Sequence, residues 1–117
     1  MDSTVSQTSN LPVVVLSEKE KMLRGEFYQA FDTELVQERQ RAKELCFRLN
    51  QTPPSDQAQR QAILRQLLSS SCSDHQEAPP PAIWIESPFH MDYGYLLQVG
   101  DNFYANHGCT ILDCNYI

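Results

Sequence analysis

Apolar and polar positions change their spacing partway along the chain, which divides it into two predicted parts. From residue 17 to 72 apolar residues recur at helical spacing, whereas residues 83–117 combine β-type composition with a six-residue repeat. Residues 73–82 are rich in proline and polar side chains, which indicates a linker, and residues 1–16 have no helical period, which indicates a flexible leader. The pattern predicts an α+β chain, a helical domain followed by a β domain.

Three helices are predicted in the first part. Ser17 and Glu20 stand at the spacing of a capping box, so a short helix should begin there. Asp32 can cap a second helix, which must end at the Pro-Pro pair of residues 53 and 54 because proline cannot continue a helix. A third helix, from about 55 to 69, carries an apolar stripe that should close on the second as a helical hairpin.

The second part carries apolar residues in two registers of period six. One register holds Val99, Ala105, Ile111 and Ile117, and the other holds Leu97, Phe103 and Cys109. Six is the period of a hexapeptide-repeat parallel β-helix, in which each side of a triangular coil contributes one inward aliphatic side chain. A short meander of strands is the alternative that the periodicity leaves open. On the first interpretation, residues 83–117 form the first coil of a β-helix.

Charge and hydropathy exclude two classes of partner. All nine Lys and Arg residues lie between Lys19 and Arg65, so the acidic second part cannot neutralise the phosphates of a nucleic acid. No apolar run approaches the length of about 20 residues that a membrane helix needs. The early run from Leu11 to Leu16 is short for a signal peptide and follows no basic residue. We therefore expect neither nucleic-acid nor membrane binding, and a cytoplasmic location.

The four cysteines, Cys46, Cys72, Cys109 and Cys114, are expected to be free thiols, because a cytoplasmic protein folds in a reducing compartment. Cys109 and Cys114 stand five residues apart, but the chain has no second ligand pair at zinc-site spacing. We therefore expect no metal site.

Two helical segments resemble one known family. Residues 18–28 (EKEKMLRGEFY) and 38–45 (ERQRAKEL) resemble the N-terminal helical domain of maltose/galactoside O-acetyltransferases, which are hexapeptide-repeat acyltransferases. Four later segments resemble, in order, the beginning of that family's left-handed β-helix: WIESPF (84–89), DYGY (92–95), VGDNFYAN (99–106) and ILD (111–113). The resemblance implies a left-handed parallel β-helix that is incomplete at Ile117.

This resemblance also implies a reaction, the transfer of an acetyl group from acetyl-CoA to a sugar hydroxyl, at sites between the subunits of a homotrimer. A general base removes the hydroxyl proton while hydrogen-bond donors stabilise the oxyanion. In the family the base is a histidine on a coil beyond the position of Ile117. We therefore assign no catalytic residue and no acetyl-CoA contact to this chain.

Four residues match acceptor-site positions of the family. Asn106 matches an asparagine beside the catalytic histidine, Asp113 and Asp92 match polar or acidic contacts to the sugar, and Tyr104 offers a ring face. The helical domain of the family also supplies an acidic contact to the sugar, which the resemblance places near Gln29 and Asp32. Each residue has a structural alternative, since the polar side chains could serve turns or a helix cap and Tyr104 could be packed.

His107 follows Asn106, but alternation along a strand should point the two side chains to opposite faces, so we do not expect His107 to act as the base. Two functional hypotheses remain. In the first, the chain is a shortened acetyltransferase that is inactive alone. In the second, it is a non-catalytic module whose helical hairpin binds full-length relatives and joins or poisons their trimers.

Overall fold

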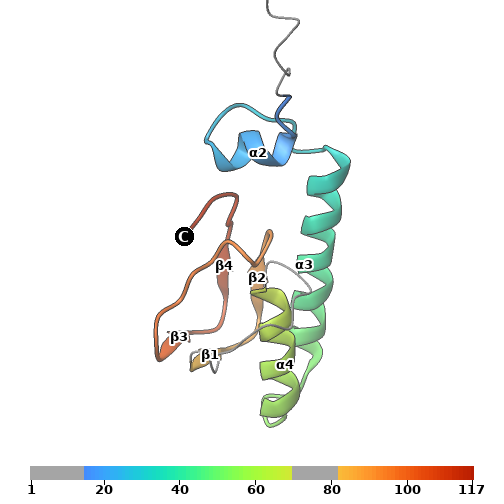
Figure 1. Cartoon of the computed structure of the whole chain (residues 1–117). Coiled ribbons are helices and arrows are strands. Elements are labelled where there is room, and N and C mark those ends of the chain that lie inside the picture. The colour runs from blue at the N-terminus through green and yellow to red at the C-terminus, as the bar shows by residue number, and fades with distance from the viewer. Residues whose placement is uncertain (1–14, 70–81) are drawn as a thin grey trace, which may run out of the picture.

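The structure, a computed structural model, describes residues 15–69 and 82–117. These ranges contain three helices followed by four short strands, with the helices beside and above the strands (Figure 1). The predicted leader and linker lie almost wholly outside the described residues, as does Cys72. The α+β composition that the sequence predicts is therefore present in the described part of the chain.

The first described helix, α2 (Glu18–Leu23), has a hydrogen-bonded cap at its start and a glycine just after its end. The Ser17 hydroxyl accepts from the Glu20 N–H at 3.0 Å, and the Glu20 carboxylate accepts from the Ser17 N–H at 2.8 Å. The capping box predicted from the sequence is thus confirmed. At the other end Gly25 takes a φ of 75°, the left-handed conformation that closes many helices.

Helices α3 (Thr33–Gln51) and α4 (Gln57–Leu67) form the predicted hairpin. Asp32 caps α3 as predicted, because its carboxylate accepts a backbone N–H of the first turn at 3.2 Å. Asp56 caps α4 in the same way, so α4 starts slightly later than predicted. Eight apolar side chains on the two helices are buried: Leu35, Ala42, Leu45, Cys46 and Leu49 of α3, and Ile63, Leu64 and Leu67 of α4.

The strands stack in parallel rather than forming a meander. Strand β1 (Ile83–Ile85) pairs with β3 (Phe103–Ala105), and β2 (Phe89–Met91) pairs with β4 (Cys109–Ile111). On a third side the N–H of Ile117 donates to the carbonyl of Leu96 at 3.0 Å, and the carbonyl of Ile117 accepts from the N–H of Gln98 at 2.8 Å. The chain therefore makes two stacked courses with three sides each.

The six-residue period predicts part of this geometry. Within each course the two strands start six residues apart, but register partners in the two courses are 20 residues apart, as in Ile83 and Phe103. Residues 83–117 consequently form two courses where the sequence suggests one coil. Ala105 is buried as predicted. Ile117, predicted to point inward, is 56% exposed because no described residue packs over it.

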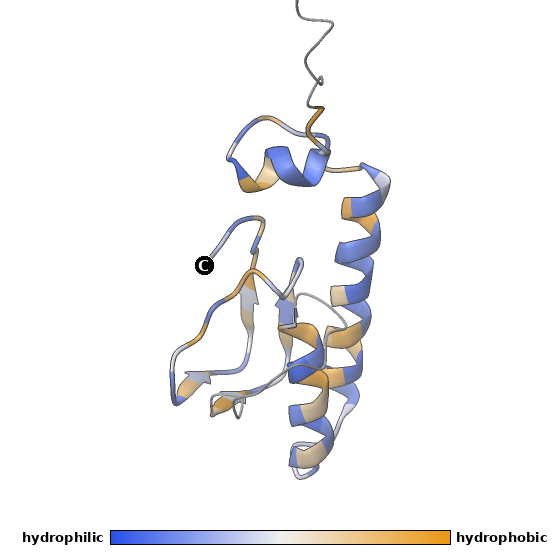
Figure 2. Ribbon diagram, in the orientation of Figure 1, coloured by the Kyte–Doolittle hydropathy of each residue, from blue (hydrophilic) through white to orange (hydrophobic). Residues whose placement is uncertain are grey.

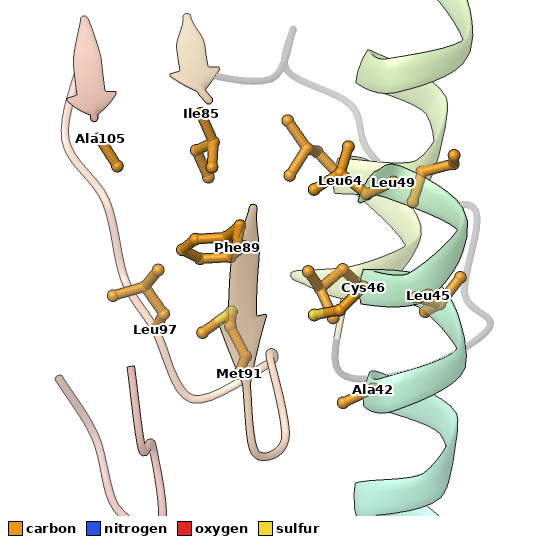
Figure 3. Packing of buried hydrophobic residues seen from close by; sticks show 12 residues of the cluster. Ala42, Leu45, Cys46, Leu49, Leu64, Ile85, Phe89, Met91, Leu97 and Ala105 are labelled. Atoms are coloured by element: carbon orange, nitrogen blue, oxygen red, sulfur yellow. The ribbon is translucent and has the colours of Figure 1, made fainter. Parts of the chain in front are cut away.

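The main core lies between the helical hairpin and the strands. Figure 3 shows Phe89 and Met91 of β2 facing Leu49 and Cys46 of α3, with Leu64 of α4 completing the contact. Figure 2 shows the same division, since the hydrophobic stripes of α3 and α4 turn toward the strands. Burial of this apolar surface is the main force that holds the hairpin against the courses.

Side chains of the helical hairpin also hydrogen-bond to the free edge of the first course. The side-chain amide of Gln61 donates to the carbonyl of Ile83 at 2.8 Å. The amide of Asn50 both donates to the carbonyl of Phe89 and accepts from its N–H, each at 3.0 Å. Asn50 therefore pairs with β2 as a neighbouring strand would, and the edge is not left open to other chains.

Removing this pairing should be costly. We expect Asn50→Ala to lower the free energy of unfolding by about 2 kcal/mol, because both backbone groups of Phe89 lose their partner in a largely buried place. Urea unfolding followed by circular dichroism measures the change. Gln51→Ala, one residue along α3 and exposed, is the control and should stay within about 0.5 kcal/mol of the parent. Equal stability of the two variants would contradict the role given to Asn50.

In the described ranges, no helix has both the length and the apolarity needed to cross a bilayer. Cys46, Cys109 and Cys114 are free thiols, the first buried and the last exposed.

Candidate functional site

Two corners of the stacked courses carry the residues that the resemblance singles out. The first corner consists of residues 86–88 and, directly above them, 106–108; it joins β1 to β2 and β3 to β4. Backbone hydrogen bonds of 3.0 and 2.9 Å tie its two levels together. The second corner consists of residues 92–94 and 112–114, at the other end of β2 and β4. The two levels of each corner are thus held in register by the parallel ladder.

Four residues with polar side chains lie at or beside the first corner. The Tyr104 hydroxyl donates to Glu86 Oε2 at 2.6 Å, and this hydrogen bond raises the pKa of Tyr104. Nδ1 of His107 lies 3.9 Å from the other oxygen of the Glu86 carboxylate. Asn106 is exposed and its Oδ1 accepts from the backbone N–H of His107 at 2.8 Å. The Asn106 Nδ2 has no partner among the described residues, so it is available to donate to a ligand.

His107 follows Asn106 directly after the end of β3, at the first corner. Both residues are exposed, and the side chain of His107 is 68% accessible. In the described part of the chain its imidazole has the Glu86 carboxylate as its charged neighbour, 3.9 Å away. That the side chains of Asn106 and His107 point to opposite faces stays a prediction.

A buried arginine of α4 hydrogen-bonds to the backbone and side chains next to the first corner. Arg60 of α4 is only 4% exposed. Its Nη2 donates to the carbonyl of Ile85 at 2.8 Å and to the hydroxyl of Ser87 at 3.0 Å, while Nη1 donates to the carbonyl of Leu49 at 3.0 Å. The guanidinium thus connects both helices of the hairpin to the residues on either side of Glu86, and it holds the corner in one position.

At the second corner Asp113 is fully buried. Its Oδ1 accepts from the N–H of Tyr93 at 2.9 Å, and its Oδ2 accepts from the N–H groups of Gly94 at 2.7 Å and Leu96 at 3.3 Å. The carboxylate therefore stabilises the turn of the first course from the level above. This is the structural alternative that the sequence leaves open for Asp113, and in this arrangement its oxygens point into the protein.

Asp92 lies at the same corner in a different environment. It is half-buried, and its carboxylate has no hydrogen-bond or ion-pair partner in the described ranges. Tyr28 lies close by: burial and, after it, the neighbouring Cys114 thiol raise its pKa, with a smaller contribution from Asp92. A carboxylate without a hydrogen-bond partner (Asp92), a hydroxyl (Tyr28) and a thiol (Cys114) are therefore neighbours beside the loop between α2 and α3.

Tyrosines that follow the second corner fasten it to the helices. Tyr93 is buried and its hydroxyl accepts from Arg39 Nη1 at 2.7 Å. The Tyr95 hydroxyl donates to Glu38, and burial followed by this contact raises the pKa of Tyr95 to about 12. The Lys19 ammonium lies 2.8 Å from the Glu38 carboxylate and 4.9 Å from the centre of the Tyr95 ring. This network ties α2, α3 and the corner into one unit.

The four residues predicted for the acceptor site therefore fall into two groups. Asn106 and Tyr104 lie at or beside the first corner, whereas Asp92 and Asp113 lie at the second, with β4 between the two corners. Asp32 is a helix cap. Within one copy of the chain the structure does not bring the four side chains into a single pocket.

Sequence reasoning missed two residues at or beside the first corner, Glu86 in the corner and Trp84 in β1. Trp84 is the register partner of Tyr104, and both side chains are about half exposed on the outward face of β1 and β3. Glu86 is placed beside Tyr104 by the same 20-residue offset. The only signal in the sequence was the alternation along each strand, and it could not reveal which residues of the two courses are stacked.

Comparison with known proteins gives consistent results. The family model described as the maltose acetyltransferase hexapeptide capping motif matches residues 21–71. A protein of Staphylococcus haemolyticus that carries the name of an acetyltransferase is 43% identical over 99 residues, which are 84% of this chain and 47% of that protein. The chain thus spans about half the length of the curated relatives it matches.

Two solved structures resemble the chain. The maltose O-acetyltransferase of Clostridium difficile 630 has a TM-score of 0.76 and 38% identity, and the match covers 88% of this chain and 51% of that one. A hexapeptide-repeat acetyltransferase of Vibrio cholerae, solved with acetyl coenzyme A, has a TM-score of 0.61 and 27% identity, and the match covers 86% of this chain and 50% of that one. The helical hairpin and the stacked courses therefore occur together in known enzymes.

Proposed function

The chain belongs to the maltose/galactoside O-acetyltransferase family of hexapeptide-repeat acyltransferases, and from this premise we propose that it forms the acceptor side of an enzyme that transfers an acetyl group from acetyl-CoA to a sugar hydroxyl. The family's left-handed β-helix would continue from the second course. The exposed amide of Asn106, held at a rigid corner with a free N–H donor, is the observation that supports this proposal most directly.

Asn106 can orient the sugar without interfering with the proton transfer. Its amide nitrogen donates a hydrogen bond but carries no charge and does not titrate, so it does not compete with a general base for the hydroxyl proton. Tyr104 beside it offers a half-exposed ring to the apolar face of the sugar. In the family the base is a histidine on a later coil, and we propose that the acetyl-CoA contacts also lie on later coils. These 117 residues would then bind and orient the acceptor.

The division of the predicted site between two corners supports assembly from more than one copy. Asp92, which has no side-chain partner in the described ranges, lies at the second corner, while Asn106 lies at the first. A closed ring of three copies, each a triangular stack, can place the first corner of one copy against the second corner of its neighbour. We therefore propose that the complete acceptor site lies between subunits of a homotrimer.

A chimera tests the proposal. In the Clostridium difficile maltose O-acetyltransferase, the aligned half would be replaced by these 117 residues, and acetylation of maltose would be followed with acetyl-CoA. We expect activity in the chimera and a loss of about a hundredfold in kcat/KM for Asn106→Ala. Gln98→Ala, which removes another exposed amide on the third side, should leave kcat/KM unchanged. The 117-residue chain alone is expected to turn over no acetyl-CoA.

Two results would contradict the proposed function. Turnover of acetyl-CoA by the purified chain with any sugar of a panel would refute the prediction that it is inactive alone. If kcat/KM of the Asn106→Ala chimera lay within twofold of the parent chimera, as is expected for Gln98→Ala, Asn106 would not belong to the acceptor site.

A second candidate is a non-catalytic module whose helical hairpin binds full-length relatives and joins their trimers. Phe47 of α3, in this hairpin, is 62% exposed, as an apolar contact to another chain would require. Co-expression with a full-length relative followed by native mass spectrometry separates the two candidates, because only the module predicts mixed trimers with reduced activity.

A further inference from the structure

Arg60 is a buried cation that pairs with no carboxylate in the described part of the chain. It is 4% exposed, and its guanidinium donates only to uncharged acceptors. Burying a charge without a countercharge is costly, and apolar side chains such as Ile63 and Leu64 of the same helix fill the core at lower cost. Packing alone therefore does not explain an arginine at this position.

The end of α3 offsets the charge of Arg60. Nη1 donates to the carbonyl of Leu49 at 3.0 Å and to that of Thr52 at 3.2 Å. Leu49 lies in the last turn of α3, and Thr52 caps this helix. Carbonyls at the end of a helix lack partners within it and carry partial negative charge, so they stabilise a cation. One nitrogen of the guanidinium is therefore anchored to the end of a long helix.

The other nitrogen holds the lower level of the first corner. Nη2 donates to the carbonyl of Ile85 at 2.8 Å and to the hydroxyl of Ser87 at 3.0 Å. These two acceptors lie on either side of Glu86, where β1 ends. Because the guanidinium is planar and rigid, its two nitrogens fix the separation between the end of α3 and the corner.

Two backbone hydrogen bonds carry this constraint to the upper level, where Asn106 lies. The N–H of Glu86 donates to the carbonyl of Ala105 at 3.0 Å, and the N–H of Gly108 donates to the carbonyl of Pro88 at 2.9 Å. The carbonyl that Arg60 binds and the N–H of Glu86 belong to one planar peptide group, so Arg60 fixes the orientation of the first of these bonds. Asn106 is thus suspended between two hydrogen bonds to the segment that Arg60 holds.

We propose that Arg60 is a positioning residue for the acceptor sugar, which sets the place of the Asn106 amide without contacting the substrate. This inference rests on the proposed function, in which Asn106 orients the sugar. A small displacement of an orienting group lowers the rate strongly, because the reacting atoms must meet in one geometry. A residue buried behind the corner can therefore control acetylation at its surface.

Arg60→Lys in the Clostridium difficile chimera tests the proposal. Lysine keeps the charge, but its single ammonium nitrogen cannot replace a fork whose two nitrogens serve α3 and the corner separately. We expect kcat/KM for maltose to fall about tenfold, whereas KM for acetyl-CoA should stay within about twofold, since we place the acetyl-CoA contacts on later coils. Rates are referred to the folded protein, measured by circular dichroism.

Gln61→Ala is the matched control. Gln61 is the next residue of α4, and it donates to the carbonyl of Ile83 at 2.8 Å, in the same strand β1 but at the end away from the corner. Its replacement removes a hydrogen bond between α4 and β1 and should leave kcat/KM for maltose and KM for acetyl-CoA unchanged. The same kinetic constants in Arg60→Lys and Gln61→Ala would overturn the proposal.

A double-mutant cycle distinguishes positioning from a general loss of activity. If Arg60 acts through Asn106, Arg60→Lys should cost less than about twofold in a chimera that already carries Asn106→Ala. A substitution that merely destabilises the protein would lower the activity by the same factor with and without Asn106. Equal factors in the two backgrounds would therefore refute the positioning role.

Ser87→Ala is a milder variant for the case in which Arg60→Lys does not fold. It removes one hydrogen bond of 3.0 Å and leaves Arg60 in place, and we expect kcat/KM for maltose to fall about threefold. Hydrogen exchange of the 117-residue protein gives a readout that needs no activity. The amide protons of Glu86 and Gly108 should exchange about tenfold faster in either variant, but not in Gln61→Ala.

These results separate the two proposals. Unchanged exchange at both amides would overturn the role of Arg60, whatever the activity of the chimera. An inactive parent chimera together with faster exchange would refute the proposed function and leave Arg60 as the residue that positions Asn106.

Discussion

Replacing Gly94 with alanine is expected to lower the free energy of unfolding by about 4 kcal/mol, through strain and overpacking together. Gly94 has a φ of 93°, a conformation that residues with a Cβ rarely adopt. A Cβ at this position would lie 2.3 Å from the carbonyl oxygen of Leu67 and 2.8 Å from its Cδ1. The oxygen belongs to the backbone at the end of α4, so the helix would have to move away from the second corner.

Gly25→Ala is the matched control. Gly25 also has a positive φ, of 75°, but nothing lies within 4 Å of an added Cβ. Its replacement should cost about 1 kcal/mol, from backbone strain alone. Both variants can be measured by urea unfolding. If the two substitutions cost the same, the close approach of α4 to the second corner would be refuted, because a Cβ meets the backbone of Leu67 at Gly94 and open space at Gly25.

The helical part of the fold could be predicted because its determinants are local. The capping box at Ser17 and Glu20 and the cap at Asp32 act within one helical turn, and the apolar stripes of α3 and α4 repeat within a few residues. Such signals are visible in any window of the sequence. The edge pairing by Asn50 was not predictable in this way, since it joins residues 39 positions apart.

The stacking of the courses could be predicted only in part. The period of six identifies the two strands of each course, but the offset of 20 between courses depends on the length of the turns, which no short window shows. Without that offset, neither the pairing of Trp84 with Tyr104 nor the place of Glu86 could be known. The role of Asp113 was unpredictable for the same reason, because only the offset of 20 places its carboxylate against the backbone of residues 93–96.

Replacing Asp113 with alanine is expected to lower the free energy of unfolding by about 4 kcal/mol. The carboxylate is fully buried and accepts from three backbone N–H groups, those of Tyr93, Gly94 and Leu96. Each buried N–H left without an acceptor costs about 1–3 kcal/mol, and the removed atoms leave a cavity as well. Asp113→Asn should be less costly, since one oxygen remains, but its amide hydrogens would then face an N–H donor.

Asp92→Asn separates this structural role from a role in sugar binding. Asp92 is half-buried and its carboxylate has no partner in the described ranges, so its replacement should change stability by less than about 0.5 kcal/mol. In the chimera, Asp92→Asn should raise KM for maltose without lowering the stability of the protein. Asp113→Asn should instead reduce activity only in proportion to the fraction of the protein that is unfolded. A stable Asp113→Asn protein with impaired acetylation would instead make Asp113 a sugar contact. It would mean that the carboxylate turns outward when the acceptor binds, because its inward position leaves no oxygen for a hydroxyl.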